Sequence, residues 1–153
     1  MATWSDQRIA LLSVHPQHAE AILDGRKTVE LRRSFPIADV THVVVYATSP
    51  VQRIVGWFSV AGVHSASPEQ IWNDHGARTA VAFDDFREYF QGSDQAVAIL
   101  VGICHRLEEP IGLDTLPSNS RPPQSFRYLR HEDLDALPTL SSELGSRQLL
   151  MLR

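Results

Sequence analysis

The only lysine of the chain, Lys27, lies in the segment DGRKTVELRR at residues 24–33, together with three arginines. Glu30 follows Lys27 by three residues and precedes Arg32 and Arg33. Ammonium and guanidinium groups bind phosphates and base carbonyl oxygens. A carboxylate held among them stays ionised and accepts hydrogen bonds from an exocyclic amine or a ribose hydroxyl. The segment is therefore a candidate for a polar site that binds a nucleotide.

Two other interpretations of this segment stay open. Glu30 and Arg32 could pair with neighbouring strands of an ordinary sheet, with Arg26 and Arg33 solvated. Arginine outnumbers lysine thirteen to one in the chain, so the single lysine indicates a position that needs a compact, titratable ammonium, with chance retention as the alternative.

Three further groups of polar residues are candidates to line the same site. Ser13 and His15 end the first predicted strand, and Tyr46, Thr48 and Ser49 end another, where a ring could stack a base. In the sequence PPQSF the two prolines stiffen a loop that presents Gln124 and Ser125 in a fixed orientation. The alternative for this loop is a rigid surface crossing whose Phe126 plugs the core. We count Ser13, Tyr46, Thr48, Ser49, Gln124 and Ser125 as ligand-binding candidates.

Elements of several kinds must position these residues. Apolar runs and alternation predict strands at 9–14, 27–33, 40–47, 54–63 and 95–104. Proline, capping and glycine signals predict helices at 16–24, from 67–70 onward and at 83–90, and a short helix at 126–129. Residues 148–152 suit a strand or a helix. Gly56 inside its strand indicates a bulge or a close backbone approach.

The order of these elements predicts the fold class. Strands and short helices follow one another without regular βαβ alternation, which favours an α+β fold with a small mixed barrel or curled sheet. With 153 residues, 43% of them hydrophobic, we expect a single domain over residues 1–153.

Charge and composition limit the classes of ligand and cofactor that we expect. The net charge of −4 provides no positive field for a long duplex, so a polyanion must be bound locally. Cys104 is the only cysteine, and HExxH, CxxC and GxGxxG patterns are absent from the sequence, so we expect no metal and no cofactor. Without a signal peptide or a membrane-length apolar run, we expect a cytoplasmic protein with no membrane partner.

The segment SVHPQHAEAILDGRKTVELRR, followed by VVVYATSP and IVGWFSV, resembles the ASCH domain family of the PUA-like superfamily. The marker of that family is GxKxxExR, which is met here by Gly25, Lys27, Glu30 and Arg32. The resemblance implies a small β-barrel with flanking helices and a cleft lined by this strand. It also implies binding of RNA or of a modified nucleoside or nucleotide.

The resemblance leaves open whether the protein is an enzyme. One reading is a binding module in which Lys27, Arg32 and Arg33 contact phosphate or base acceptors and Glu30 contacts donors. The other is a hydrolase using Lys27 and Glu30, either a nuclease or an enzyme similar to N4-acetylcytidine amidohydrolases. Those amidohydrolases carry a threonine nucleophile three residues after the lysine, where this chain has Glu30. A protein-binding role and the oligomeric state stay open.

Overall fold

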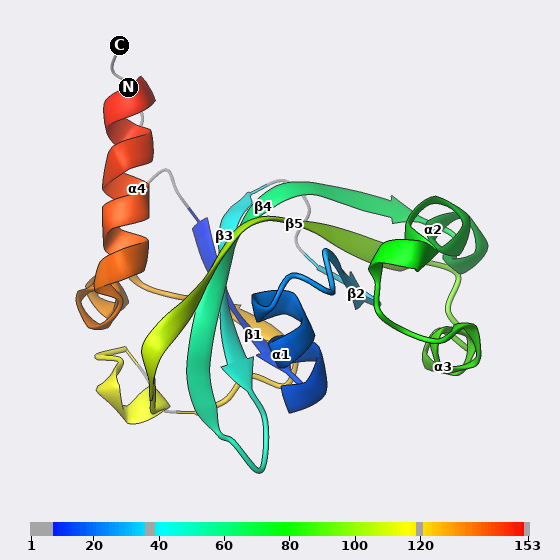
Figure 1. Cartoon of the computed structure of the whole chain (residues 1–153), viewed down its shortest axis with the longest axis horizontal. Helices are drawn as coiled ribbons and strands as arrows, with labels where there is room; N and C mark the ends of the chain where they lie inside the picture. The colour runs from blue at the N-terminus through cyan, green and yellow to red at the C-terminus, as the bar shows by residue number, and fades with distance from the viewer. Residues whose placement is uncertain (1–7, 36–38, 119–120, 152–153) are drawn as a thin grey trace.

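The computed structural model describes residues 8–35, 39–118 and 121–151, which form one mixed six-stranded sheet with short helices around it (Figure 1). The strands are β1 (Arg8–Val14), β2 (Val29–Arg32), β3 (Val40–Ala47), β4 (Arg53–Ala66), β5 (Ala96–Ile111) and β6 (Phe126–Tyr128). The α-helices are α1 (Pro16–Leu23), α2 (Pro68–His75), α3 (Phe83–Tyr89) and α4 (Pro138–Met151). Short 3-10 turns are η2 (Gly76–Arg78), η3 (Leu113–Thr115) and η4 (His131–Ala136).

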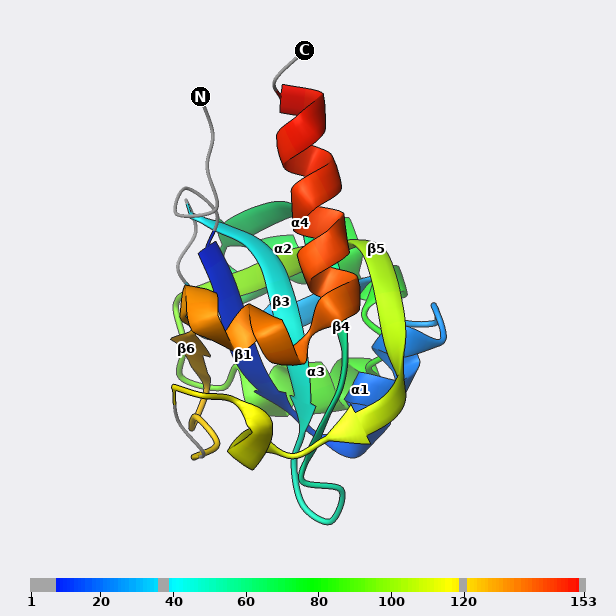
Figure 2. The same ribbon diagram turned by 90° about the vertical axis from the view of Figure 1, so that its left-hand side faces the viewer.

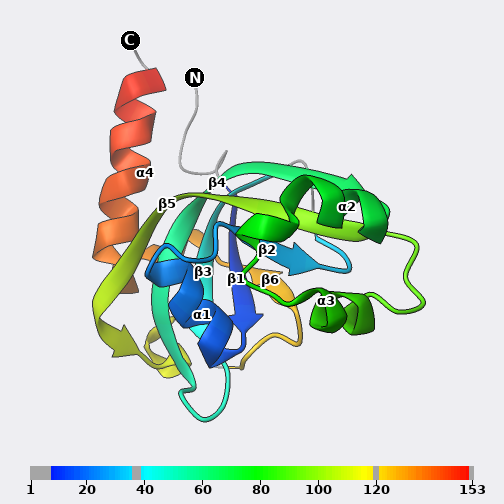
Figure 3. The same cartoon turned by 45° about the vertical axis from the view of Figure 1, so that its right-hand side comes forward.

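The sheet has the strand order β2-β5-β4-β3-β1-β6. β1 and β3 run parallel, while the other neighbouring pairs are antiparallel. The long strands β4 and β5 bend along their length, so that the sheet curls into a half-barrel around α1 (Figures 1 and 3). This architecture confirms the predicted α+β class and small barrel-like sheet. It also brings β2, at one edge, close to the carboxyl end of β1.

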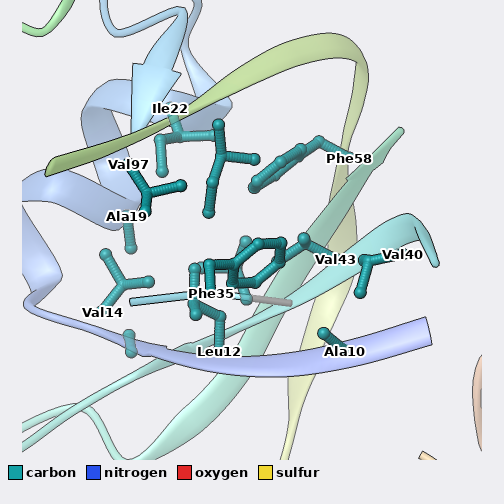
Figure 4. Packing of buried hydrophobic residues seen from close by; sticks show 13 residues of the cluster. Ala10, Leu12, Val14, Ala19, Ile22, Phe35, Val40, Val43, Phe58 and Val97 are labelled. Carbon is teal, nitrogen blue, oxygen red and sulfur yellow. The ribbon is translucent and has the colours of Figure 1, made fainter. Parts of the chain in front are cut away.

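Helix α1 fills the concave side of the half-barrel. Its buried residues Ala19 and Ile22 pack with Leu12, Phe35 and Phe58 in the cluster drawn in Figure 4. A second cluster lies on the other face and includes Leu140 and Leu144 of α4. Figure 2 shows α4 in front of the sheet. A third joins α2 and α3 to β2 and β5. In the described residues, none of the helices has both the length and the apolar character needed to cross a bilayer.

Most of the predicted elements are present, and the local signals explain their ends. Pro16 lies in the first turn of α1, and Gly25 follows its end with a φ of +86°, in the left-handed region. Ser67 caps α2 by accepting a hydrogen bond from the backbone N–H of Gln70 at 3.2 Å. The undecided residues 148–152 continue α4 as far as Met151, and Leu152 lies outside the described residues.

The predicted helix at 126–129 is wrong, because Phe126–Tyr128 form the edge strand β6 and Leu129 follows it outside any helix. Phe126 and Tyr128 both pack against the cluster of Figure 4, so alternate residues face the core, as in a strand. The segment pairs with β1, from Leu12 opposite Phe126 to Ala10 opposite Tyr128. The segment is therefore a strand because it pairs with the free edge of β1.

Gly56 makes the close backbone approach that was predicted. A Cβ at this position would lie 2.5 Å from the backbone oxygen of His105 and 2.6 Å from a methyl carbon of Leu23. The register between β4 and β5 also shifts between Ile54 and Gly56. Only a residue without a side chain fits there without displacing the neighbouring strand.

Replacing Gly56 with alanine is expected to lower the free energy of unfolding by about 1–3 kcal/mol, because the added methyl group overpacks a rigid backbone contact. Urea unfolding followed by tryptophan fluorescence measures this. Gly62→Ala is the matched control, since its Cβ would meet the flexible side chain of Leu100 at 3.3 Å. Equal losses in the two variants would contradict the explanation.

Candidate functional site

A cavity of about 500 Å³ opens where the end of β1, the start of α1, β2, α3 and the proline-rich loop meet. Its lining comprises Ser13, Val14, His15, His18, Lys27, Glu30, Leu31, Arg32, Arg33, Thr48, Val81, Asp85, Phe86, Tyr89, Gln124 and Ser125. We refer to it as the polar pocket. It unites eight of the ten predicted ligand-binding residues, although they come from four separate parts of the sequence.

Lys27 is buried at this pocket, with 1% of its surface exposed. Its backbone N–H donates to the carbonyl of Ala21 at 2.9 Å, which fixes the chain against the end of α1. Its Nζ donates to the backbone oxygen of Thr79 at 2.6 Å and lies 3.4 Å from Oε1 of Glu30. The ammonium therefore has one neutral and one charged acceptor, supplied by different elements.

Burial lowers the pKa of Lys27 below its ordinary value of 10.5, because a charged ammonium loses its hydration there. Glu30 opposes this shift through its charge and a hydrogen bond, while the positive charge of Arg32 adds to it. The ammonium consequently gives up its proton more readily than a solvated lysine does.

Glu30 is also engaged by Arg32 on its other oxygen. Oε2 of Glu30 accepts hydrogen bonds from Nε and Nη2 of Arg32 at 3.2 and 2.9 Å. Nη2 of Arg32 also donates to the backbone oxygen of Ser13 at 2.6 Å. Val29 and Leu31 pack into the third cluster, so Glu30 and Arg32 share the opposite face, as the strand alternation predicts. One carboxylate thus balances two cations.

Ser13 joins the proline-rich loop to this network. Its Oγ donates to the backbone oxygen of Pro123 at 2.6 Å, and its N–H donates to that of Ser125 at 3.0 Å. These two bonds continue the pairing of β1 with β6 and hold Gln124 and Ser125 at the pocket. The structure has features of both readings of this loop, because Gln124 and Ser125 line the pocket while Phe126 packs against the core beside Phe35, with ring centroids 5.6 Å apart.

Arg33 and Tyr89 form an exposed stack at the pocket. The guanidinium carbon of Arg33 lies 4.0 Å from the ring centroid of Tyr89, and its Nε and Nη2 donate to the Tyr89 backbone oxygen at 3.1 and 2.7 Å. The planar cation is held in a fixed place by the end of α3. Sequence reasoning placed Arg33 in the site but did not find its partner.

Two of the predicted ligand-binding residues, Tyr46 and Ser49, lie outside the polar pocket. Within the described part of the chain, the pocket lining includes Thr48 but neither of these residues. Tyr46 is 4% exposed and packs with Val44 and Trp57 in the second cluster. It shares the strand parity of Val44, and this side of β3 is covered by apolar side chains, so its ring cannot stack a ligand in the pocket.

His18, Asp85 and Tyr89 line the pocket without having been predicted as site residues. Burial lowers the pKa of His18, and the positive charge of Lys27 lowers it further, while Glu30 opposes the shift. The spacing of His15 and His18 by three residues, at the start of a helix that follows a strand, could have indicated His18. Asp85 and Tyr89 share a similar helical spacing on α3.

A cluster of His64, Asp74 and His75 was also not foreseen, and its potential ligand atoms lie within 4.8 Å of one another. Nη2 of Arg78 lies 2.6 Å from Nδ1 of His75, and a guanidinium can only donate. His75 then donates from Nε2 to Nδ1 of His64 at 2.9 Å. These bonds occupy ring-nitrogen lone pairs of His64 and His75 that would otherwise bind a metal. We therefore infer that the cluster stabilises η2, which precedes Thr79.

A larger hollow of about 1170 Å³ lies between α2 and α3. It is lined by aromatic residues such as Trp72 and Phe83 and by the acidic residues Glu69, Asp84 and Glu88. None of the predicted site residues lies in this lining. Its acidic groups would repel a phosphate, so the polar pocket is the better candidate for the functional site.

Comparison with known proteins agrees with this geometry. Residues 12–104 match the ASCH domain family, and this range includes Lys27, Glu30 and Arg32. The chain belongs to the ASCH domain family. This ASCH protein is 33% identical over 143 residues to an "ASCH domain-containing ribonuclease" of Zymomonas mobilis subsp. mobilis. The match covers 91% of this chain and 96% of the relative.

A crystal structure of an ASCH protein from Zymomonas mobilis superimposes on this ASCH protein with a TM-score of 0.79 and 31% identity. The match covers 86% of this chain and 94% of the other. Similarity also extends, at 26% identity over 121 residues, to the large ribosomal subunit protein uL22 of Ureaplasma parvum serovar 3. That match covers 78% of this chain and 39% of the ribosomal protein.

Replacing Glu30 with glutamine is expected to lower the free energy of unfolding by about 3–5 kcal/mol, because Lys27 and Arg32 then lose the charge that balances them. Chemical unfolding at neutral pH measures this. The control is Glu20→Gln, which breaks the exposed pair of Glu20 with Arg106 and is expected to cost at most about 1 kcal/mol. A Glu30→Gln protein as stable as the control would contradict the assigned role of Glu30.

Proposed function

We propose that this ASCH protein binds single-stranded RNA in the polar pocket and cleaves it. The observation that carries the proposal is the buried ammonium of Lys27, held by Glu30 and by the Thr79 carbonyl at a cavity large enough for a nucleotide. The name of the Zymomonas mobilis relative supports the same activity. Perturbed titratable groups that converge in a pocket are typical of catalytic sites.

The chemistry of the pocket suits a flexible single strand. Arg33 is exposed and planar, so it can contact a phosphate or stack on a base beside Tyr89. Thr48, Gln124 and Ser125 add hydroxyl and amide groups that bond base edges or ribose hydroxyls. With a net charge of −4, binding depends on this local arrangement and not on a surface-wide positive field.

In the proposed reaction Lys27 supplies a positive charge and a proton near the scissile phosphate. Its lowered pKa favours proton donation to a leaving oxygen. Glu30 orients the ammonium and balances its charge. The hydrolase reading of the sequence uses both Lys27 and Glu30, and the engagement of both Glu30 oxygens favours an orienting role for that carboxylate.

Hydrolysis of N4-acetylcytidine is the weaker hydrolase candidate. The position three residues after Lys27 holds Glu30, which is paired with two cations and is not a free nucleophile. Thr28 is exposed and does not belong to the described lining of the pocket. A modified nucleoside can still be a ligand of the same pocket, so it is included in the test below.

The test compares short single-stranded RNA, duplex RNA, single-stranded DNA and N4-acetylcytidine as ligands and substrates. We expect saturable binding and shortening of single-stranded RNA, with both decreasing as salt is raised. Lys27→Met is expected to lower the cleavage rate by about 100-fold or more, because it removes the proposed proton donor. Gel analysis of labelled RNA measures the rate, and circular dichroism verifies the fold.

Arg26→Met is the matched control, because Arg26 precedes Lys27 and its side chain is 65% exposed. It should leave the cleavage rate within about twofold of the wild type, as expected for a solvated residue. Binding of RNA without cleavage would support the binding-module reading. Turnover of acetylcytidine in place of RNA would overturn the proposed reaction.

A further inference from the structure

Cleavage of RNA by its own 2′-hydroxyl needs a base that removes the hydroxyl proton. Glu30 is poorly suited to this, because Oε2 accepts two bonds from Arg32 and Oε1 faces the ammonium of Lys27. The other titratable side chains of the lining are His15, His18, Asp85 and Tyr89. The pocket therefore offers a choice of base outside the motif itself.

The position of His18 relative to Lys27 distinguishes it from the others. His18 lies one helical turn before Ala21 on α1, and the Ala21 carbonyl accepts the backbone N–H of Lys27. Both side chains line the pocket, and the ammonium is near enough for its charge to act on the imidazole. His18 is half-buried, whereas His15, with its ring centroid 6.5 Å away, is exposed.

We propose that His18 is the general base of the ribonuclease reaction, and that the reaction leaves 2′,3′-cyclic phosphate and 5′-hydroxyl ends. This inference rests on the proposed function. A ring nitrogen of His18 takes the proton of the 2′-hydroxyl while O2′ bonds to phosphorus. The bond from phosphorus to O5′ breaks, and O5′ takes a proton from the ammonium of Lys27. Exchange with solvent then returns both side chains to their starting states.

The surroundings of His18 favour a neutral imidazole at physiological pH. Burial and the charges of Lys27, His15 and Arg32 lower its pKa below 6.5, and Glu30 opposes them. Asp85, Arg33 and Tyr89 also face the pocket. The cleavage rate should rise with pH as His18 loses its proton, and should fall again as Lys27 loses its own, below pH 10.5.

The first test replaces His18 with asparagine and compares it with His105→Asn. His105 stacks on Trp57, with centroids 5.5 Å apart, and does not belong to the pocket lining. We expect His18→Asn to slow cleavage by about 100-fold or more, to bind RNA within about twofold of the wild type, and to lose the acidic limb of the pH profile. A His18→Asn rate within about threefold of the control would overturn the proposal.

A second measurement needs no variant and so is independent of any folding defect. Mass spectrometry of the wild-type products should show cyclic phosphate ends, and RNA with every 2′-oxygen methylated should stay intact. Products with 3′-hydroxyl and 5′-phosphate ends would overturn the His18 mechanism and leave ribonuclease activity standing. Failure of the wild type to cleave any RNA would instead overturn the proposed function.

Discussion

Burial of the single ammonium group of the chain is the constraint on which the site depends. Transfer of such a charge from water into a protein interior is costly unless acceptors replace its hydration. The protein supplies these acceptors from two elements, the carboxylate of Glu30 on β2 and the backbone oxygen of Thr79 after η2. Both elements must be in place before Lys27 can occupy its position.

Much of the local architecture serves this placement. Thr79 is fully buried and its Oγ1 donates to the Gly76 carbonyl at 2.8 Å, while Ala80 has a φ of +54°, in the left-handed region. The backbone N–H of Thr28 donates to the Arg78 carbonyl at 3.0 Å, and this bond joins η2 to the residue that precedes β2. These bonds direct a backbone oxygen at the lysine.

The arrangement is better explained by function than by stability. Arg32, which shares Glu30 with Lys27, adds a second positive charge close to the first. An apolar side chain in place of a buried charged pair is often as stable or more so. Two cations on one carboxylate instead suit the proposed binding of an anionic ligand and the proposed proton donation by Lys27.

The sequence indicated the charged residues that line the pocket better than it indicated their partners. Lys27, Glu30 and Arg32 could be found because strand alternation and the family motif are local signals. Thr79 could not, because its contribution is a backbone oxygen 52 residues away from Lys27, and such a contact leaves no trace in residue type. Tyr46 was expected beside these residues, yet it lies outside the pocket, because period-two alternation does not say which face of a strand borders the pocket.

Element prediction failed for a similar reason. Phe126 and Tyr128 alternate as in a strand, but a run of three residues is too short to decide, and their pairing depends on the open edge of β1, a tertiary feature. His18 and Tyr89 lie on α1 and α3, whose apolar residues the sequence pattern indicates. The direction in which the polar side of each helix points depends on how the helix packs against the sheet, which the pattern does not indicate.

Because Lys27 is the only lysine, selective ¹³C labelling of lysine yields a single side-chain signal whose pH titration reports this site alone. The account predicts a midpoint below 10.5 that falls further in Glu30→Gln and rises in Arg32→Gln, since Glu30 raises the pKa of Lys27 and Arg32 lowers it. A wild-type midpoint at or above 10.5, unchanged in both variants, would contradict it.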